Sequence, residues 1–153
     1  MIPAQHRKKA VALSIALSLV AGAEGLRQVA YLDPVGIPTA CFGETKNVRM
    51  GQTFTLEECK AMLAASLLEA DQAIERCVKV PLPPAREAAL ISFTYNVGGG
   101  AFCSSTLVRK LNAGDTPGAC DELLRWTKAR GVELPGLKRR RAEERQLCMQ
   151  GLT

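Results

Sequence analysis

Residues 24–42 read EGLRQVAYLDPVGIPTACF, and they contain the strongest strand and turn signals in the chain. Its segment 31–36 (YLDPVG) reads as the end of a strand followed by a turn, because Asp, Pro and Gly all favour turns. Its segment 39–42 (TACF) reads as the returning strand. We therefore expect a small β-hairpin sheet in this part of the chain.

The chain beyond the hairpin predicts helices. The sequence TLEE at 55–58 is a capping box, and it opens a helix that we expect to run to about Val78. Prolines at 81, 83 and 84 break the chain after it. Further helices are predicted over about 85–95, 105–112, 115–128 and 137–149. The fold class that follows is α+β, mostly helical, with the hairpin sheet beside a helical lobe.

Composition limits the kinds of protein that the chain can be. Its 153 residues suit one domain with a short appendage, and 47% hydrophobic residues exclude a disordered chain. The six cysteines form no C-x-x-C pair and suit an oxidising compartment, where we expect them to form disulfides in a pairing that the sequence leaves open. The one histidine, His6, lies in a basic leader, which argues against a Ser-His-Asp or Cys-His hydrolase. Chemistry therefore falls to carboxylates and hydroxyls.

The N-terminal segment has the pattern of an export signal. The basic run HRKK at 6–9 precedes 14 uncharged residues at 10–23. The uncharged run is short and weakly apolar for a membrane span, and Ser14, Ser18 and Gly22 would share one helix face. Three interpretations compete: a signal peptide cleaved after Ala23, a permanent anchor, and a segment that enters the membrane weakly and later leaves it.

Two carboxyls stand out by their context. Glu24 is the first acid after the uncharged run, and we expect it near a helix C-terminus among apolar neighbours, where its protonated form is favoured. Asp33 lies in the turn, where it would more easily stay ionised. Two carboxyls in contrasting environments suit glycoside hydrolysis.

The spacing of these residues adds a resemblance to a known family. Glu24, eight residues, Asp33, five residues and Thr39 resemble the Glu–Asp–Thr signature of the phage-type lysozymes of glycoside hydrolase family 24. The segments FTYNVG at 93–98 and GLKRRRAEERQLC at 136–148 are similar to two further segments of that family. The sequence departs from the family at Glu44, where a His is frequent. Any ion pair that this His makes is therefore either absent here or rebuilt with a cation such as Lys46 or Arg49, and we do not expect the chemistry to depend on it.

The resemblance implies a lysozyme-like fold and an activity. Glu24 would protonate the leaving oxygen of the β-1,4 bond between N-acetylmuramic acid and N-acetylglucosamine in peptidoglycan. Asp33, helped by Thr39, would activate a water on the opposite face of the sugar, which inverts the anomeric centre and places the carboxyls roughly 6.5–9.5 Å apart. Asn96 and Thr106 would line the substrate cleft, and neither a metal nor another cofactor is needed. The alternatives are a lytic transglycosylase and a non-catalytic module that binds cell walls or nucleic acid.

The resemblance also bears on the N-terminus. Cleavage after Ala23 would remove the helix that should hold Glu24, so we expect residues 1–23 to be an uncleaved signal-anchor-release segment that joins the first helix of a catalytic domain at 24–153. The enzyme would be held inactive at the host inner membrane through residues 10–23, and then be released as an active form in the periplasm. We expect a monomer with peptidoglycan as its partner and no nucleic acid. The basic run KRRR at 138–141 is accordingly expected to be a solvated helix face, and Trp126 to lie in the core.

Overall fold

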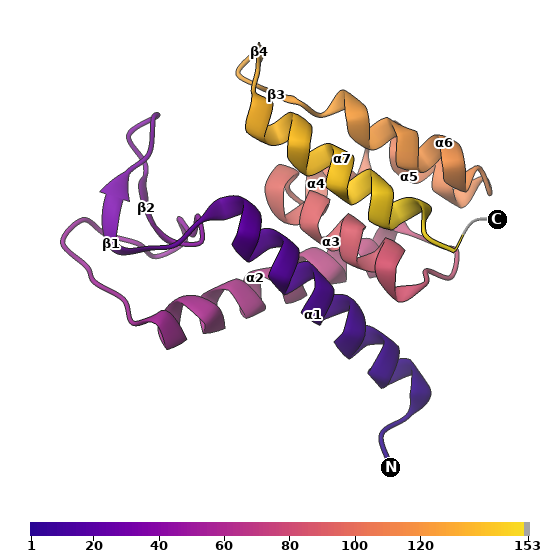
Figure 1. The fold of residues 1–153 in the computed structure, drawn as a ribbon, viewed down its shortest axis with the longest axis horizontal. Helices are drawn as coiled ribbons and strands as arrows, with labels where there is room; N and C mark the ends of the chain where they lie inside the picture. The colour runs from indigo at the N-terminus through magenta and orange to yellow at the C-terminus, as the bar shows by residue number, and fades with distance from the viewer. Residues whose placement is uncertain (152–153) are drawn as a thin grey trace.

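The structure, a computed structural model, describes residues 1–151, and its helices and strand pairs confirm the predicted α+β class. The helices are α1 (Ala4–Glu24), α2 (Leu56–Cys77), α3 (Pro84–Val97), α4 (Gly99–Cys103), α5 (Thr106–Asn112), α6 (Thr116–Glu122) and α7 (Pro135–Met149), with a 3-10 turn, η1, at Leu123–Arg125. The strands are β1 (Arg27–Leu32), β2 (Pro38–Cys41), β3 (Lys128–Ala129) and β4 (Val132–Glu133). Figure 1 shows the β1–β2 hairpin on one side of the molecule and α3 to α7 on the other, with α1 running toward the hairpin.

The expected hairpin is present, and a second one was not predicted. Strands β1 and β2 pair antiparallel with Tyr31 opposite Thr39, which confirms the prediction from the turn residues. The helix expected to reach residue 128 ends with η1 at Arg125, and the chain then forms the short β3–β4 pair. Each of these strands has two residues, too few for a recognisable alternating pattern.

Helix α1 packs against α3 through small residues. Ala12, Ala16 and Val20 recur every four residues and are fully buried, whereas Ser14 and Ser18 on another face are exposed. The helix ends at Glu24, and Gly25 has a φ of 73°, a conformation that glycine adopts without strain. Within residues 1–151, no helix combines the length with the apolar character needed to cross a membrane.

Helix α3 is the centre of the core. It packs against α1, α2 and α7, and its residues 88–94 are all buried. Trp126 is partly buried on the core as expected, with its ring 5.2 Å from that of Phe93 in an edge-to-face arrangement. The buried middle of α3 holds α1 and α7 in a fixed relation, and the candidate site lies where α1 ends and α7 begins.

All six cysteines form disulfides, in accord with the expectation from composition. The pairs are Cys41–Cys59, Cys77–Cys103 and Cys120–Cys148. They join β2 to α2, α2 to α4, and α6 to α7. Each disulfide therefore connects two different elements of the fold.

The interpretation of the KRRR run as a solvated helix face is wrong for half of the run. Lys138 and Arg139 are exposed, but Arg140 is 5% exposed and Arg141 is fully buried. The reason is Glu144, which is also fully buried and lies one helical turn away, where it neutralises both guanidinium groups. These buried charges lead directly to Glu24.

Candidate active site

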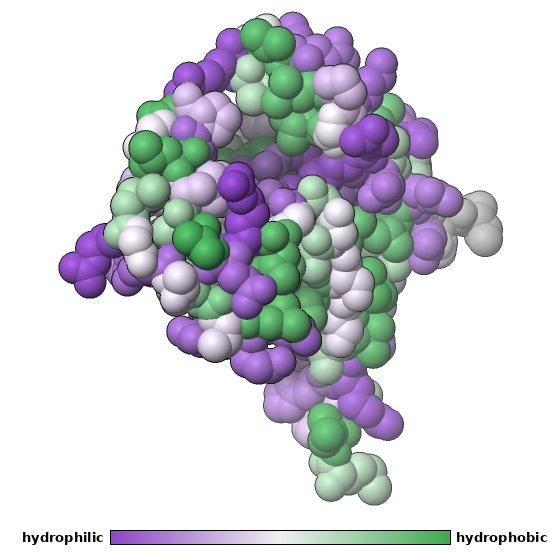
Figure 2. Space-filling model, turned by 60° about the vertical axis from the view of Figure 1, so that its left-hand side comes forward, coloured by the Kyte–Doolittle hydropathy of each residue, from purple (hydrophilic) through white to green (hydrophobic). Residues whose placement is uncertain are grey.

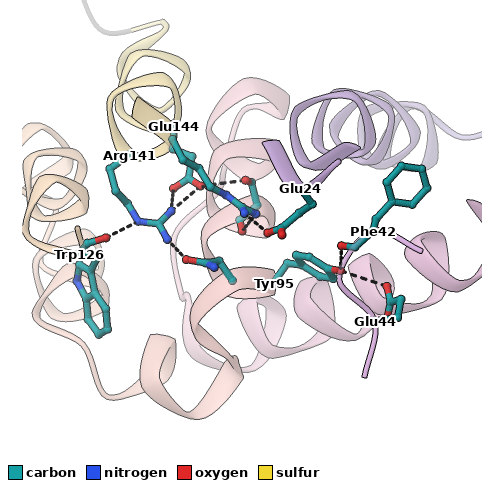
Figure 3. A network of polar contacts seen from close by, with 10 residues as sticks. Glu24, Phe42, Glu44, Tyr95, Trp126, Arg141 and Glu144 are labelled. Atoms are coloured by element: carbon teal, nitrogen blue, oxygen red, sulfur yellow. Dashed lines mark hydrogen bonds and ion pairs between the residues drawn. The ribbon is translucent and has the colours of Figure 1, made fainter. Parts of the chain in front are cut away.

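Glu24 occupies the last position of α1, where its carboxylate meets Arg140 of α7. The Arg140 Nη1 donates to Glu24 Oε1, and the Glu24 side chain is 25% exposed (Figure 3). The sequence predicted the helix end correctly but placed only apolar groups around this carboxyl. A guanidinium from 116 residues further along the chain is its nearest partner instead, and no local pattern could have indicated that contact.

Arg140 is itself held by buried acceptors. Its Nε donates to Glu144 Oε1 at 3.2 Å, and its Nη2 donates to the carbonyl oxygen of Ser92 at 3.2 Å. Because Glu144 and Ser92 belong to α7 and to the central helix α3, the guanidinium is fixed before any substrate arrives. Arg140 thereby fixes the Glu24 side chain.

Arg141 extends the same network toward Asn96. Its Nη1 donates to Glu144 Oε2 at 2.6 Å, its Nε donates to the Trp126 carbonyl at 3.0 Å, and its Nη2 donates to Asn96 Oδ1 (Figure 3). The Asn96 amide is therefore oriented with its oxygen toward Arg141. Its Nδ2 donates to none of residues 1–151, so its protons are available to a ligand.

Asp33 closes the turn of the hairpin. Its Oδ1 accepts hydrogen bonds from the backbone N–H groups of Val35 at 2.9 Å and Ile37 at 2.8 Å. These bonds fix the rotamer of the side chain. Within residues 1–151 no group donates to Oδ2, which leaves that oxygen able to bind a water.

Thr39 lies on β2, opposite Tyr31 of β1, and is 5% exposed. Its hydroxyl donates to the carbonyl oxygen of Ile37 at 2.9 Å. Because the one hydroxyl proton is used in this way, the Thr39 oxygen can act toward a water only as an acceptor.

A cavity of about 710 Å³ opens beside the end of α1. Its walls come from the last turns of α1, from Asn96, and from the first turns of α7, and they include Glu24 and Arg140. Figure 2 shows this face of the molecule hollowed, with hydrophilic residues inside the hollow. Of the five residues predicted for the site, Glu24 and Asn96 line this cavity.

The other three predicted residues lie outside the wall of that cavity. Asp33 and Thr39 belong to the β1–β2 hairpin, which contributes no residue to the wall of this cavity. Thr106 begins α5, where its Oγ1 accepts a hydrogen bond from Arg109 Nη2 at 2.8 Å. Within residues 1–151, no cluster of three or more His, Cys, Asp or Glu side chains could hold a metal ion.

The charge of Glu44 acts on that of Glu24, and the contacts of Glu44 distinguish the two alternatives that the sequence left open. Its partners are Ser66 and Tyr95, whereas Lys46 pairs with Glu69 at 3.4 Å. Burial raises the pKa of Glu44, and the charges of Glu69 and Glu24 act in the same direction, against the two hydrogen bonds that it accepts. Within residues 1–151 Glu44 makes no ion pair, so the ion pair is absent rather than rebuilt, and neutral hydroxyl groups are the partners of Glu44.

Comparisons with known proteins give this arrangement a context. The Phage lysozyme family matches residues 21–144. The SAR-endolysin of Bacteriophage PS119 is 47% identical over 131 residues, which are 85% of this chain and 78% of that protein.

Two solved structures extend the likeness to the fold. The crystal structure of a mutant of P22 lysozyme has a TM-score of 0.79 and 35% identity, covering 89% of this chain and 96% of its own. The crystal structure of the active form of the P1 phage endolysin Lyz has a TM-score of 0.83 and 26% identity, covering 99% of this chain and 97% of its own.

Proposed function

The chain belongs to the phage lysozyme family, and on that premise we propose that Glu24, Asp33 and Thr39 are its catalytic residues. The protein is a lysozyme of the endolysin type, which hydrolyses bacterial peptidoglycan and causes lysis of the host cell. The bond would be the β-1,4 linkage between N-acetylmuramic acid and N-acetylglucosamine. The observation that carries the assignment is the carboxyl of Glu24 at the cavity, held by a buried arginine.

Glu24 would act as the general acid. Since Arg140 donates to Oε1, a proton on this carboxyl belongs on Oε2, the oxygen that faces Gly43. Transfer of that proton to the leaving glycosidic oxygen creates a carboxylate, and the guanidinium of Arg140 stabilises the charge that appears. The network around Glu144 keeps Arg140 from moving during this step.

Asp33 and Thr39 would hold the attacking water. Asp33 Oδ2 and the Thr39 oxygen can each accept one proton of a water, which leaves a lone pair of that water free to attack the anomeric carbon. As the bond to the leaving group breaks, Asp33 takes the proton of the water. This is a single displacement with inversion, and it requires a carboxyl separation of roughly 6.5–9.5 Å to leave room for the water.

Asn96 would contribute to substrate binding. Its oxygen is committed to Arg141, so its amide N–H groups are directed to donate to an acceptor such as the carbonyl of an N-acetyl group. Its place in the cavity wall supports this role. Thr106 would bind a more distant part of the glycan, since it begins α5 outside that wall.

Residues 1–23 would act as a signal-anchor-release segment. The basic run at 6–9 and the uncharged run at 10–23 support transient insertion into the inner membrane. In the released periplasmic form these residues would belong to α1, which ends at Glu24, so release would assemble the active site. N-terminal sequencing of the periplasmic protein tests this role, because a mature chain that begins at Glu24 would contradict it.

The reaction itself is tested on purified peptidoglycan. Mass spectrometry should find reducing-end muropeptides, and NMR of a soluble fragment should find the inverted anomer as the first product. Products with a 1,6-anhydro end would identify a lytic transglycosylase instead and would leave Asp33 and Thr39 without a role. Loss of these products in Asp33→Asn, with the fold retained, is the expected result for the proposed base.

A further inference from the structure

The turn at residues 40–44 lies directly against the carboxyl of Glu24. The backbone of this turn is closed by two hydrogen bonds, from Ala40 N to Glu44 O at 2.9 Å and from Glu44 N to Ala40 O at 2.8 Å. Within it Gly43 has a φ of 96°, and a Cβ atom added there would lie 3.3 Å from Glu24 Oε2. The 40–44 turn therefore lies against Oε2 of Glu24 and leaves little room for a side chain at position 43.

The side chain of Glu44 ties this turn to two helices. Its Oε2 accepts a hydrogen bond from Ser66 Oγ of α2 at 2.8 Å, and its Oε1 lies 3.2 Å from the hydroxyl of Tyr95 of α3. The same hydroxyl lies 3.0 Å from the carbonyl oxygen of Phe42 in the turn (Figure 3). Glu44 is 8% exposed, so water does not readily replace these contacts.

Counting protons shows which form of Glu44 satisfies the contacts. The Tyr95 hydroxyl has one proton, so it cannot donate both to Phe42 O and to an ionised Glu44. If Glu44 is protonated on Oε1, its O–H donates to the Tyr95 oxygen, and Tyr95 donates to Phe42 O. Each of the three contacts is then a hydrogen bond with its own proton: Glu44 to Tyr95, Tyr95 to the Phe42 carbonyl, and Ser66 to Glu44 Oε2.

The charged groups around Glu44 favour the same form. Glu24 of α1 and Glu69 of α2 both face it, and each makes ionisation of Glu44 less favourable. The nearby cations are committed elsewhere, because Lys46 pairs with Glu69 and Arg140 of α7 pairs with Glu24. Burial acts in the same direction, and the pKa of Glu44 is accordingly raised above the ordinary value of a Glu.

We propose that Glu44 is a positioning residue, protonated in the active enzyme, which through Tyr95 and Phe42 holds Gly43 against the catalytic acid Glu24. Loss of the proton leaves Tyr95 with two acceptors for one proton and adds a negative charge that faces Glu24. The 40–44 turn then loosens, and the rate of catalysis falls on the alkaline side of its pH profile. The proposal rests on the proposed role of Glu24 as the acid.

The decisive variant is Glu44→Gln, because an amide imitates a protonated carboxyl. Its N–H can donate to the Tyr95 oxygen and its carbonyl can accept from Ser66, at every pH. We expect Glu44→Gln to keep kcat near the wild-type maximum and to move the alkaline limb of the kcat profile upward, to the limit that deprotonation of the proposed acid Glu24 sets. Glu44→Ala removes the hydrogen bonds to Ser66 and Tyr95 and should lower kcat by roughly tenfold to hundredfold with little change in KM.

Two further measurements separate this role from a purely structural one. Glu57→Gln changes an exposed carboxyl of α2 whose charge is not among those that act on Glu44, and it should leave the profile close to that of the wild type. Infrared difference spectra are recorded on the Glu24→Gln background, where the carboxyl of the proposed acid is absent. Glu24→Gln should then contain the carbonyl band of a protonated carboxylic acid at neutral pH, and the double variant Glu24→Gln/Glu44→Gln should lack that band. Soluble peptidoglycan fragments serve as the substrate, so that kcat and KM are measured separately.

The outcomes that contradict the proposal are distinct from those that contradict the catalytic assignment. An alkaline limb that is identical in the wild type and Glu44→Gln, or a band that is the same in Glu24→Gln and Glu24→Gln/Glu44→Gln, would overturn the role of Glu44. Equal loss of kcat in Glu44→Gln and Glu44→Ala would also overturn it. Full activity in Glu24→Gln, measured in the same series, would instead refute Glu24 as the acid, whatever the Glu44 variants do.

Discussion

Lys9→Met is expected to weaken the attachment of α1 to the rest of the enzyme. The Lys9 ammonium lies 2.8 Å from Asp71 Oδ2 and 3.1 Å from Glu75 Oε1, and it also contacts Glu87. Among residues 1–151, it is the one cation paired with Asp71 and Glu87, whose side chains are 6% and 10% exposed. The change would leave two buried carboxyls without a counter-ion and would join α1 less firmly to α2 and α3.

The size of the effect follows from the burial of the three partners. Removing one member of a buried ion pair costs about 3–5 kcal/mol, and the exposed Glu75 adds at most about 1 kcal/mol. Because the Lys9 side chain is 30% exposed, the expected loss is somewhat smaller, about 2–4 kcal/mol. For a chain of this length, that loss lowers Tm by roughly 4–16 °C.

Lys8→Met is the matched control, since it removes the same charge one residue away. Lys8 is exposed and makes no ion pair with residues 1–151, so its replacement should change stability by less than about 0.5 kcal/mol. Tm is measured by circular dichroism on the purified full-length chain, with both variants beside the wild type. Equal Tm values for the two variants at neutral pH would show that the contacts of Lys9 with Asp71 and Glu87 do not stabilise the fold.

The pH dependence of the Lys9→Met effect provides a second check. Desolvation lowers the pKa of Lys9, but its hydrogen bonds to Asp71, Glu87 and Glu75 together raise it above the ordinary value. A raised lysine pKa adds stability that is fully present below the unfolded value near 10.4 and is lost as the pH rises through the folded value. The Tm difference between wild type and Lys9→Met should therefore persist up to about pH 10 and should shrink in acid, where the carboxyls are protonated.

Three further predictions concern stability. Glu144→Gln removes the negative charge between two buried guanidinium groups and should lower the free energy of unfolding by about 3–5 kcal/mol. The midpoint of unfolding should then occur at a lower urea concentration. A midpoint equal to that of the wild type would contradict the buried ion network. Reduction of the three disulfides, which close loops of 18, 26 and 28 residues, should cost about 3 kcal/mol for each bond and lower Tm, and an unchanged Tm in reductant would contradict this. The raised pKa of Glu44 adds stability that is present below the pKa of an unfolded Glu, near 4.3, and is lost as the pH rises through the pKa of Glu44 in the folded protein. Between these two pKa values, the Tm of the wild type should fall relative to that of Glu44→Gln. Plots of Tm against pH that run parallel for the two proteins would contradict the raised pKa.

The parts of the fold that could be predicted from sequence depend on local interactions. The β1–β2 hairpin follows from turn residues within a few positions of one another, and the start of α2 follows from a capping box in which Thr55 and Glu58 bond to each other's backbone. The position of Glu24 at the end of α1 follows from the uncharged run before it and from Gly25 after it. In each of these places, the residues that determine the structure are neighbours in the chain.

The surroundings of the site could not be predicted in the same way. The contact of Glu24 with Arg140 and the bond of Glu44 with Tyr95 join residues that are 116 and 51 positions apart. For Glu44, sequence reasoning weighed only the nearby cations Lys46 and Arg49. The buried network around Glu144 likewise depends on how α3 and α7 pack, which the local charge pattern of α7 does not indicate.

We propose that Glu24 donates the proton which breaks the glycan bond. The rate at which a bacterial cell-wall suspension clears is the most direct test of this role. Glu24→Gln, with the Tm and circular dichroism of a folded protein, should clear the suspension at least about 100-fold more slowly than the wild type, because loss of a general acid typically costs that much. Glu133→Gln, which changes an exposed carboxyl on β4, should clear it at the rate of the wild type. Clearing by Glu24→Gln at a rate close to that of the wild type would show that Glu24 is not the proton donor.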